Sequence, residues 1–171
     1  MRSKLAAFVC CMVVTANSAV GQESTRIFPP SVEIETGDAW VYQGARYRLY
    51  GVQSCIRGTV AQAANGAESD CGAQSIASLA ALFMTGTISC QPVGTAKDQA
   101  SFVVCAADVD GQTIDVGTAL IASGAAFAAA FPSGDPVSTP YLVAEMTAKA
   151  NRNGLWAGRF QHPVRLLLQP K

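Results

Sequence analysis

The stretch from Ser31 to Val52 constrains the fold more than any other part of the chain, because three short strand-like segments follow one another there. Val32 and Ile34 alternate with acidic residues, the segment 40–42 is apolar, and Arg46 to Val52 forms the third segment. Short alternating segments separated by turn residues are typical of half-buried antiparallel strands. We therefore expect the fold to begin near Ser31 with a meander that curls into a small barrel.

The chain begins with a leader sequence. Two basic residues precede an apolar run from Leu5 to Val14, and small residues follow up to Gly21. The run is shorter than the about 20 residues that span a bilayer, so the order predicts a signal peptide at residues 1–21, cleaved before Gln22. We expect residues 22–171 to form one secreted or periplasmic domain, with no membrane span after cleavage.

Charge gives no support for a nucleic-acid partner. After cleavage the chain keeps 10 basic and 12 acidic residues, a net charge of −2, and no run of basic residues occurs. Proteins that bind phosphate backbones usually carry an excess of Lys and Arg on one face.

Four cysteines follow the leader: Cys55, Cys71, Cys90 and Cys105. An even number in an exported chain predicts two disulfides, and the absence of a Cys-x-x-Cys pair and the distance of the only histidine, His162, argue against a metal site. Three connectivities are possible and the sequence alone does not choose between them. Spacing and the expected strands favour Cys55–Cys71 and Cys90–Cys105.

Three segments show helical signals: 72–85, 114–124 and 139–153. Asp70 precedes the first as an N-cap residue, and Gly86 ends it. Helices mixed with short strands place the chain in the α+β class.

The segments between these helices are predicted from composition. Residues 87–91 and 101–107 are expected to be paired strands, with 102–105 buried on both faces, and 58–68 to be a loop. Residues 125–130 should be buried, either as a helix extension or as packed coil. The apolar tail, 155–168, should pack back on the barrel.

Four segments, in this order and spacing, carry a family resemblance. They are Gly37-Asp38 followed ten residues after the aspartate by Arg48–Val52, Cys71–Ala73, Ile114–Ala126, and Ala148–Gly158. The chain resembles the staphylococcal-nuclease-like (thermonuclease) family over about residues 32–163. The resemblance implies a five-stranded OB-type β-barrel with three helices.

The family hydrolyses phosphodiesters with calcium, a cation that takes about six to eight oxygen ligands. The resemblance places its first calcium aspartate on Asp38 and its first phosphate-binding arginine on Arg48, and both are present. The second calcium aspartate falls on Gln53, the general-base glutamate on Ile56, and the second arginine on Ala100, the last residue of a turn. Three of the five groups are therefore missing, and calcium binding is in doubt.

Other residues could replace the missing groups or give the remaining ones a different role. A base could be supplied by Glu68 or Asp70, which otherwise belong to a solvated loop and a helix cap. Asp38 could be a turn former and Arg48 an ion-pair partner, and we prefer this structural interpretation to a working site. Ser54 falls on a position that donates only a backbone carbonyl.

Two further features have structural explanations that compete with functional ones. His162, beside aromatic residues, is expected to pack rather than to bind a ligand, and Glu145 and Lys149 have the spacing of a helical ion pair. A set of aromatic residues could form a stacking platform or the barrel core: Trp40, Tyr42, Tyr47 and Tyr50.

These observations lead to competing functions. The first is an exported, non-catalytic module with a binding or accessory role at the cell envelope, and the resemblance links some exported members to exopolysaccharide (succinoglycan) biosynthesis. The alternative is a metal-dependent phosphodiesterase with an atypical, weakened site. Electrostatic binding of nucleic acid is disfavoured by the net charge. No motif names a ligand or a partner.

Overall fold

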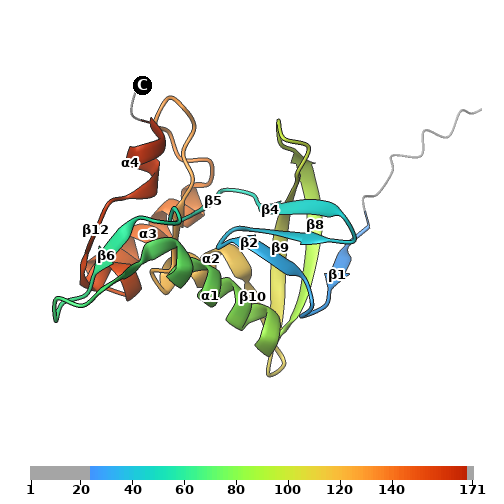
Figure 1. The fold of residues 1–171 in the computed structure, drawn as a ribbon. Coiled ribbons are helices and arrows are strands. Elements are labelled where there is room, and N and C mark those ends of the chain that lie inside the picture. The colour runs from blue at the N-terminus through green and yellow to red at the C-terminus, as the bar shows by residue number, and fades with distance from the viewer. Residues whose placement is uncertain (1–23, 169–171) are drawn as a thin grey trace, which may run out of the picture.

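The computed structural model describes residues 24–168, so the predicted signal peptide lies outside the described residues. The chain is an α+β protein whose main sheet is strongly curled (Figure 1). The strands are β1 (Arg26–Phe28), β2 (Glu33–Thr36), β3 (Ala39–Tyr42), β4 (Ala45–Leu49), β5 (Val52–Ser54), β6 (Val60–Gln62), β7 (Glu68–Asp70), β8 (Thr87–Thr95), β9 (Ser101–Val109), β10 (Gln112–Asp115), β11 (Ala126–Ala128) and β12 (Arg159–Phe160). The helices are α1 (Cys71–Thr85), α2 (Val116–Ala122), α3 (Thr139–Ala150), the 3-10 turn η1 (Gly154–Ala157) and α4 (Pro163–Leu168).

The main sheet has the strand order β1-β8-β9-β4-β3-β2, and β10 pairs with β9. β2, β3 and β4 form the predicted antiparallel meander, and β8 and β9 form a long antiparallel hairpin. Because α1 connects the meander to the hairpin, β9 can return parallel to β4. Two small sheets join β5 to β11 and β6 to β7 and β12. The barrel-like α+β fold is confirmed, with more strands than the five expected.

The segment before Ser31 belongs to the sheet, so the prediction that the fold begins near Ser31 is wrong. β1 pairs antiparallel with β8. Phe28 at its end is buried, with its ring centroid 5.3 Å from that of Trp40 and 4.7 Å from that of Tyr47. Burying one such side chain contributes about 2–3 kcal/mol. Phe28 therefore anchors the strand.

Three other expectations fail because pairing between distant segments decides the local structure. Residues 58–68 are not a simple loop but contain β6 and the first residue of β7. Residues 125–130 are buried as predicted, but their centre is strand β11, paired with β5. Within β9, Val103 and Cys105 are buried whereas Val104 is exposed, so only one face of this strand is covered.

The helix caps agree with the sequence in most details. Asp70 accepts a hydrogen bond from the backbone N–H of Ala73 at the start of α1, and Gly86 is its C-cap. Asp115 caps α2 in the same way. In the third helix Ser138 occupies the N-cap position without a capping hydrogen bond from its side chain, and the helix is shorter than predicted. The tail adds a short fourth helix, α4, to the three that were expected.

The core has two parts. The larger lies inside the curled sheet against α1 and α2 and contains Trp40 and Tyr47, so these two rings are core residues and not a stacking platform. Tyr42 packs against this cluster, and Tyr50 lies exposed beside Phe102. The smaller part holds the C-terminal tail against β6 and the start of α1: Cys55, Ala61, Cys71, Phe127 and Leu155, with Trp156 and Phe160 packed on it.

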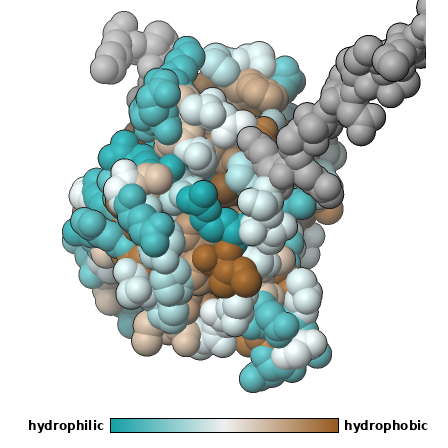
Figure 2. Space-filling model, turned by 90° about the vertical axis from the view of Figure 1, so that its right-hand side faces the viewer, coloured by the Kyte–Doolittle hydropathy of each residue, from teal (hydrophilic) through white to brown (hydrophobic). Residues whose placement is uncertain are grey.

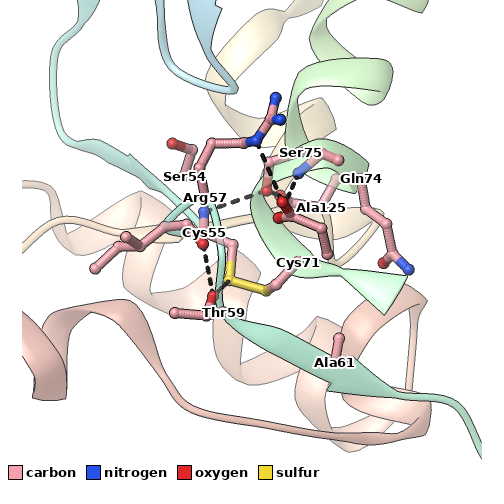
Figure 3. Close-up of a disulfide and its surroundings, with 12 residues drawn as sticks. Ser54, Cys55, Arg57, Thr59, Ala61, Cys71, Gln74, Ser75 and Ala125 are labelled. Carbon is pink, nitrogen blue, oxygen red and sulfur yellow. Dashed lines mark hydrogen bonds and ion pairs between the residues drawn. A yellow bond between two sulfur atoms is a disulfide. The ribbon is translucent and has the colours of Figure 1, made fainter. Parts of the chain in front are cut away.

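Both disulfides have the favoured connectivity. Cys90 and Cys105 are directly opposite on β8 and β9, with Cα atoms 4.0 Å apart. Cys55 and Cys71 join the end of β5 to the first residue of α1, with Cα atoms 5.6 Å apart (Figure 3). Two buried disulfides are typical of proteins from an oxidising compartment.

The surface on the side of β1, β8 and β9 is mostly polar or neutral around a limited apolar patch (Figure 2). Isolated apolar side chains on a surface are normal. Among residues 24–168, no helix combines the length and the apolar character needed to cross a membrane.

Replacing Cys90 and Cys105 together by Ala should lower the free energy of unfolding by about 3 kcal/mol. The bridge joins residues 15 positions apart and so restricts the conformations of the unfolded chain. Urea unfolding of the variant and the parent measures the difference. Peptide mapping without reduction should show Cys55 joined to Cys71, and a peptide joining Cys55 to Cys90 or Cys105 would contradict the structure.

Candidate functional site

The Gly37-Asp38 turn joins β2 to β3 and lies against α1. A Cβ atom on residue 37 would be 2.4 Å from the Cβ of Ser75, so only glycine allows the turn to approach the helix this closely. The backbone N–H of Leu49 donates to the carbonyl oxygen of Asp38 at 2.8 Å. The turn is therefore fixed by both a helix and a neighbouring strand, and the Asp38 side chain is only 5% exposed.

The carboxylate of Asp38 accepts hydrogen bonds from two hydroxyl groups. Thr36 Oγ1 and Ser54 Oγ donate to Oδ1 at 2.7 and 2.6 Å. Charge-assisted bonds of this length are among the stronger ones in proteins. Ser54 lies on β5, so this carboxylate joins the β2–β3 turn to β5, the strand that follows the meander.

Two neighbouring groups complete this network. Gln53 Nε2 donates to the backbone carbonyl of Ser54 at 2.9 Å, and that carbonyl is the one that the family resemblance assigns to a metal. Ser75 Oγ accepts from the N–H of Cys55 at 3.1 Å and donates to the carbonyl of Ala125 at 2.6 Å (Figure 3). Asp38 Oδ1 and the backbone carbonyl oxygen of Ser54 thus already accept internal hydrogen bonds.

Arg48 lies next to Asp38 but is weakly paired with it. Its Nε is 3.9 Å from Asp38 Oδ2, and its side chain is 39% exposed. Arg46 shares the outer face of β4 with Arg48 and binds Glu35 through two nitrogens, at 2.7 and 2.8 Å. The hydrogen bond and charge of Glu35 raise the pKa of the Arg46 guanidinium. Arg46 is therefore held in an ion pair with Glu35. Arg48, which is paired more weakly, is the more available of the two arginines for binding another group.

The position that the resemblance gives to the second arginine is occupied by a buried alanine. Ala100 is fully buried and directly precedes Ser101, the first residue of β9, which lies opposite Tyr47. Strand pairing places Phe102 opposite Arg48, with its ring against that of Tyr50. The residue paired with Arg48 is therefore an aromatic ring and not a second cation.

The possible replacement bases do not meet Asp38. Asp70 accepts hydrogen bonds from the N–H groups of Ala73 at 3.0 Å and Gly58 at 3.1 Å, and these bonds hold the pKa of Asp70 below its ordinary value. Its Oδ2 also lies 3.3 Å from Arg57 Nε. Glu68 is an exposed residue of β7. Asp70 is thus the N-cap of α1, as the sequence predicted.

The side chains around Asp38 do not fit calcium. Among residues 24–168, no group of three or more His, Cys, Asp or Glu side chains is arranged to hold a metal ion. Asp38 brings a single carboxylate, and Gln53 directs its amide nitrogen, a donor, at the neighbouring carbonyl. A cation that prefers several charged oxygen ligands has no matching set here.

Comparisons with known proteins do not identify a family: no family model matches the chain, and a search of curated proteins finds no match. The resemblance to the nuclease-like family therefore stays a proposal, carried by the sequence segments and by the topology.

One polar pair near the C-terminus was missed by the sequence analysis. His162 packs against aromatic rings as predicted, but its Nε2 also lies 3.0 Å from Glu145 Oε1. Glu145 does not bind Lys149, whose amino group lies over the ring of Trp156. The pairing of Glu145 with a residue 17 positions later could not be read from helical spacing.

Replacing Asp38 by Ala should lower the free energy of unfolding by about 3 kcal/mol, because the buried hydroxyl of Ser54 and the partly buried hydroxyl of Thr36 lose a charged acceptor. Asp98→Ala is the matched control, since Asp98 is an exposed partner of Arg46 at 3.6 Å and should cost less than about 0.5 kcal/mol. Chemical unfolding measures both. Equal losses in the two variants would show that the Asp38 network is not structural.

Proposed function

We propose that this protein is an exported barrel of the staphylococcal-nuclease type that no longer hydrolyses phosphodiesters and has a binding or accessory role at the cell envelope. The topology supports the family assignment. A meander (β2, β3, β4), a helix (α1), a hairpin (β8, β9) and two further helices follow one another, and β9 lies parallel to β4. We take these strands, with β5, as the core of an OB-type barrel.

The loss of hydrolysis rests on one observation. Asp38, the retained acidic position, is a buried carboxylate that accepts hydrogen bonds from Thr36 and Ser54. A general base and charge-stabilising donors each contribute about 10²-fold or more to such reactions. With Gln53, Ile56 and Ala100 at the other positions of the resemblance, Asp38 and Arg48 have no partners for this chemistry.

The envelope role rests on weaker observations. The predicted leader and the two disulfides favour an oxidising compartment outside the cytoplasm. The resemblance to exported members linked to exopolysaccharide biosynthesis gives this role its most concrete form. A retained barrel without a hydrolytic site needs another surface to carry function.

The alternative, an atypical metal-dependent phosphodiesterase, can be separated from this proposal by a nuclease assay. The purified mature protein should not cleave single-stranded or double-stranded DNA or RNA in the presence of calcium. Calcium-dependent cleavage that Asp38→Ala abolishes would contradict the proposal.

Two triple variants compare the positions at which a second arginine could stand near Arg48. We expect that a variant carrying Gln53→Asp, Ile56→Glu and Phe102→Arg keeps the fold, because residues 53, 56 and 102 are only partly buried. Placing the arginine at Ala100, the position given by the resemblance, should lower the free energy of unfolding by more than about 3 kcal/mol, since that site is fully buried. Thermal unfolding compares the two triple variants. Equal stability would contradict the burial of residue 100.

A further inference from the structure

A groove lies at the end of the molecule where the C-terminal elements gather, away from β8 and β9 (Figure 1). It is formed by α3, η1, β12 and α4, and its volume is about 980 Å³. This is the size of a site for a small organic ligand. Lys149, Trp156, Arg159, Phe160, His162 and Arg165 are among the lining residues.

The groove is positively charged in a chain without an excess of basic residues. Glu145 is the last acidic residue of the sequence, and five basic residues follow it. Three of these, Lys149, Arg159 and Arg165, are exposed and line the groove. The ion pairs found among residues 24–168 do not involve them. Their charges are therefore available to an anionic group.

Among the described residues that line the groove, the one carboxylate, Glu145, is held in a fixed position. Glu145 Oε2 accepts a hydrogen bond from the N–H of Ala128 at 2.6 Å, and Oε1 lies 3.0 Å from His162 Nε2. His162 in turn packs on Phe127, with ring centroids 4.6 Å apart. A carboxylate and an imidazole that are both partly exposed can exchange hydrogen bonds with hydroxyl groups of a ligand.

The aromatic residues of the groove are already packed against one another. Trp156 meets Phe160 edge-on at 5.1 Å and Phe127 edge-on at 5.6 Å, and Lys149 Nζ lies 5.5 Å from the centre of its ring. Both Trp156 and Phe160 are partly exposed. They offer a limited apolar area to a ligand.

We propose that this groove binds an acidic saccharide. Lys149, Arg159 and Arg165 would pair with the carboxylate of the sugar, since guanidinium groups suit planar carboxylates. Glu145 and His162 would bind the hydroxyl groups, and Trp156 with Phe160 would cover an apolar part of the ring. A nucleic acid fits less well, because a uronic acid ring has hydroxyl groups that can face Glu145 while its carboxylate faces the cations, and a phosphodiester has none.

This inference rests on the binding role proposed above and gives it a site and a ligand class. It does not depend on the loss of hydrolysis. A failed saccharide titration would leave the outcome of the nuclease assay unchanged, and cleavage in that assay would not by itself exclude the groove.

The proposal is tested by titrating the purified mature protein with oligogalacturonate. Tryptophan fluorescence and calorimetry measure the binding. Trp156 lies in the groove and the second tryptophan, Trp40, is fully buried in the main core, so a fluorescence change on binding reports on the groove. Binding should weaken by about tenfold or more in the double variant Arg159→Gln and Arg165→Gln, because each lost contact is a charge-assisted hydrogen bond. Arg57→Gln, an exposed arginine elsewhere, should bind like the parent.

Three results would overturn the proposal. They are no binding of oligogalacturonate at millimolar concentration, equal binding of a neutral maltooligosaccharide, and unchanged affinity in the double variant. Tighter binding of a single-stranded oligonucleotide, lost in the same double variant, would replace the saccharide by a nucleic acid as the occupant of the groove.

Discussion

The rest of the structure depends on the hydrogen bonds of the buried Asp38 carboxylate. They join the β2–β3 turn to β5 through Ser54, and the same turn lies directly against Ser75 of α1. Ser75 extends this connection to β5 and to the segment before β11. A carboxylate that is taken out of water must be satisfied by donors. In this protein the donors are hydroxyl groups of the chain itself, in the place where a calcium-dependent nuclease would need a cation.

Local signals made part of this structure predictable. Asp70 before an apolar helical pattern, the alternation around Val32 and Ile34, and the spacing of the cysteines all depend on neighbouring residues, and these predictions hold. β1 and β11 could not be predicted in this way, because each becomes a strand only through pairing with a distant partner. The pairing of Phe102 with Arg48 likewise depends on the register between β4 and β9, which local sequence does not specify.

The candidate site was predictable as a set of residues but not as a network. Gln53 and Ile56 could be recognised as losses from the sequence, whereas the two hydroxyl donors to Asp38 required the structure. The groove was missed for a different reason. Its basic residues are separated along the chain, so they form no charge run. The absence of acidic residues after Glu145 indicated a local excess of positive charge, which the net charge of the whole chain does not show. The two ends of the molecule thus differ in chemistry: a satisfied, buried carboxylate in the barrel and exposed cations at the C-terminal groove.

Thermal unfolding of the mature protein as a function of calcium concentration tests most directly whether Asp38 is a structural carboxylate and not a metal ligand. A ligand that binds only the folded state raises the unfolding midpoint as its concentration rises. We predict that the midpoint is the same with a chelator and with millimolar calcium, because the site has a single carboxylate, whose Oδ1 already accepts hydrogen bonds from Thr36 and Ser54, and Gln53 donates to the Ser54 carbonyl. A midpoint that rises with calcium, and that no longer does so in Asp38→Asn, would contradict this conclusion.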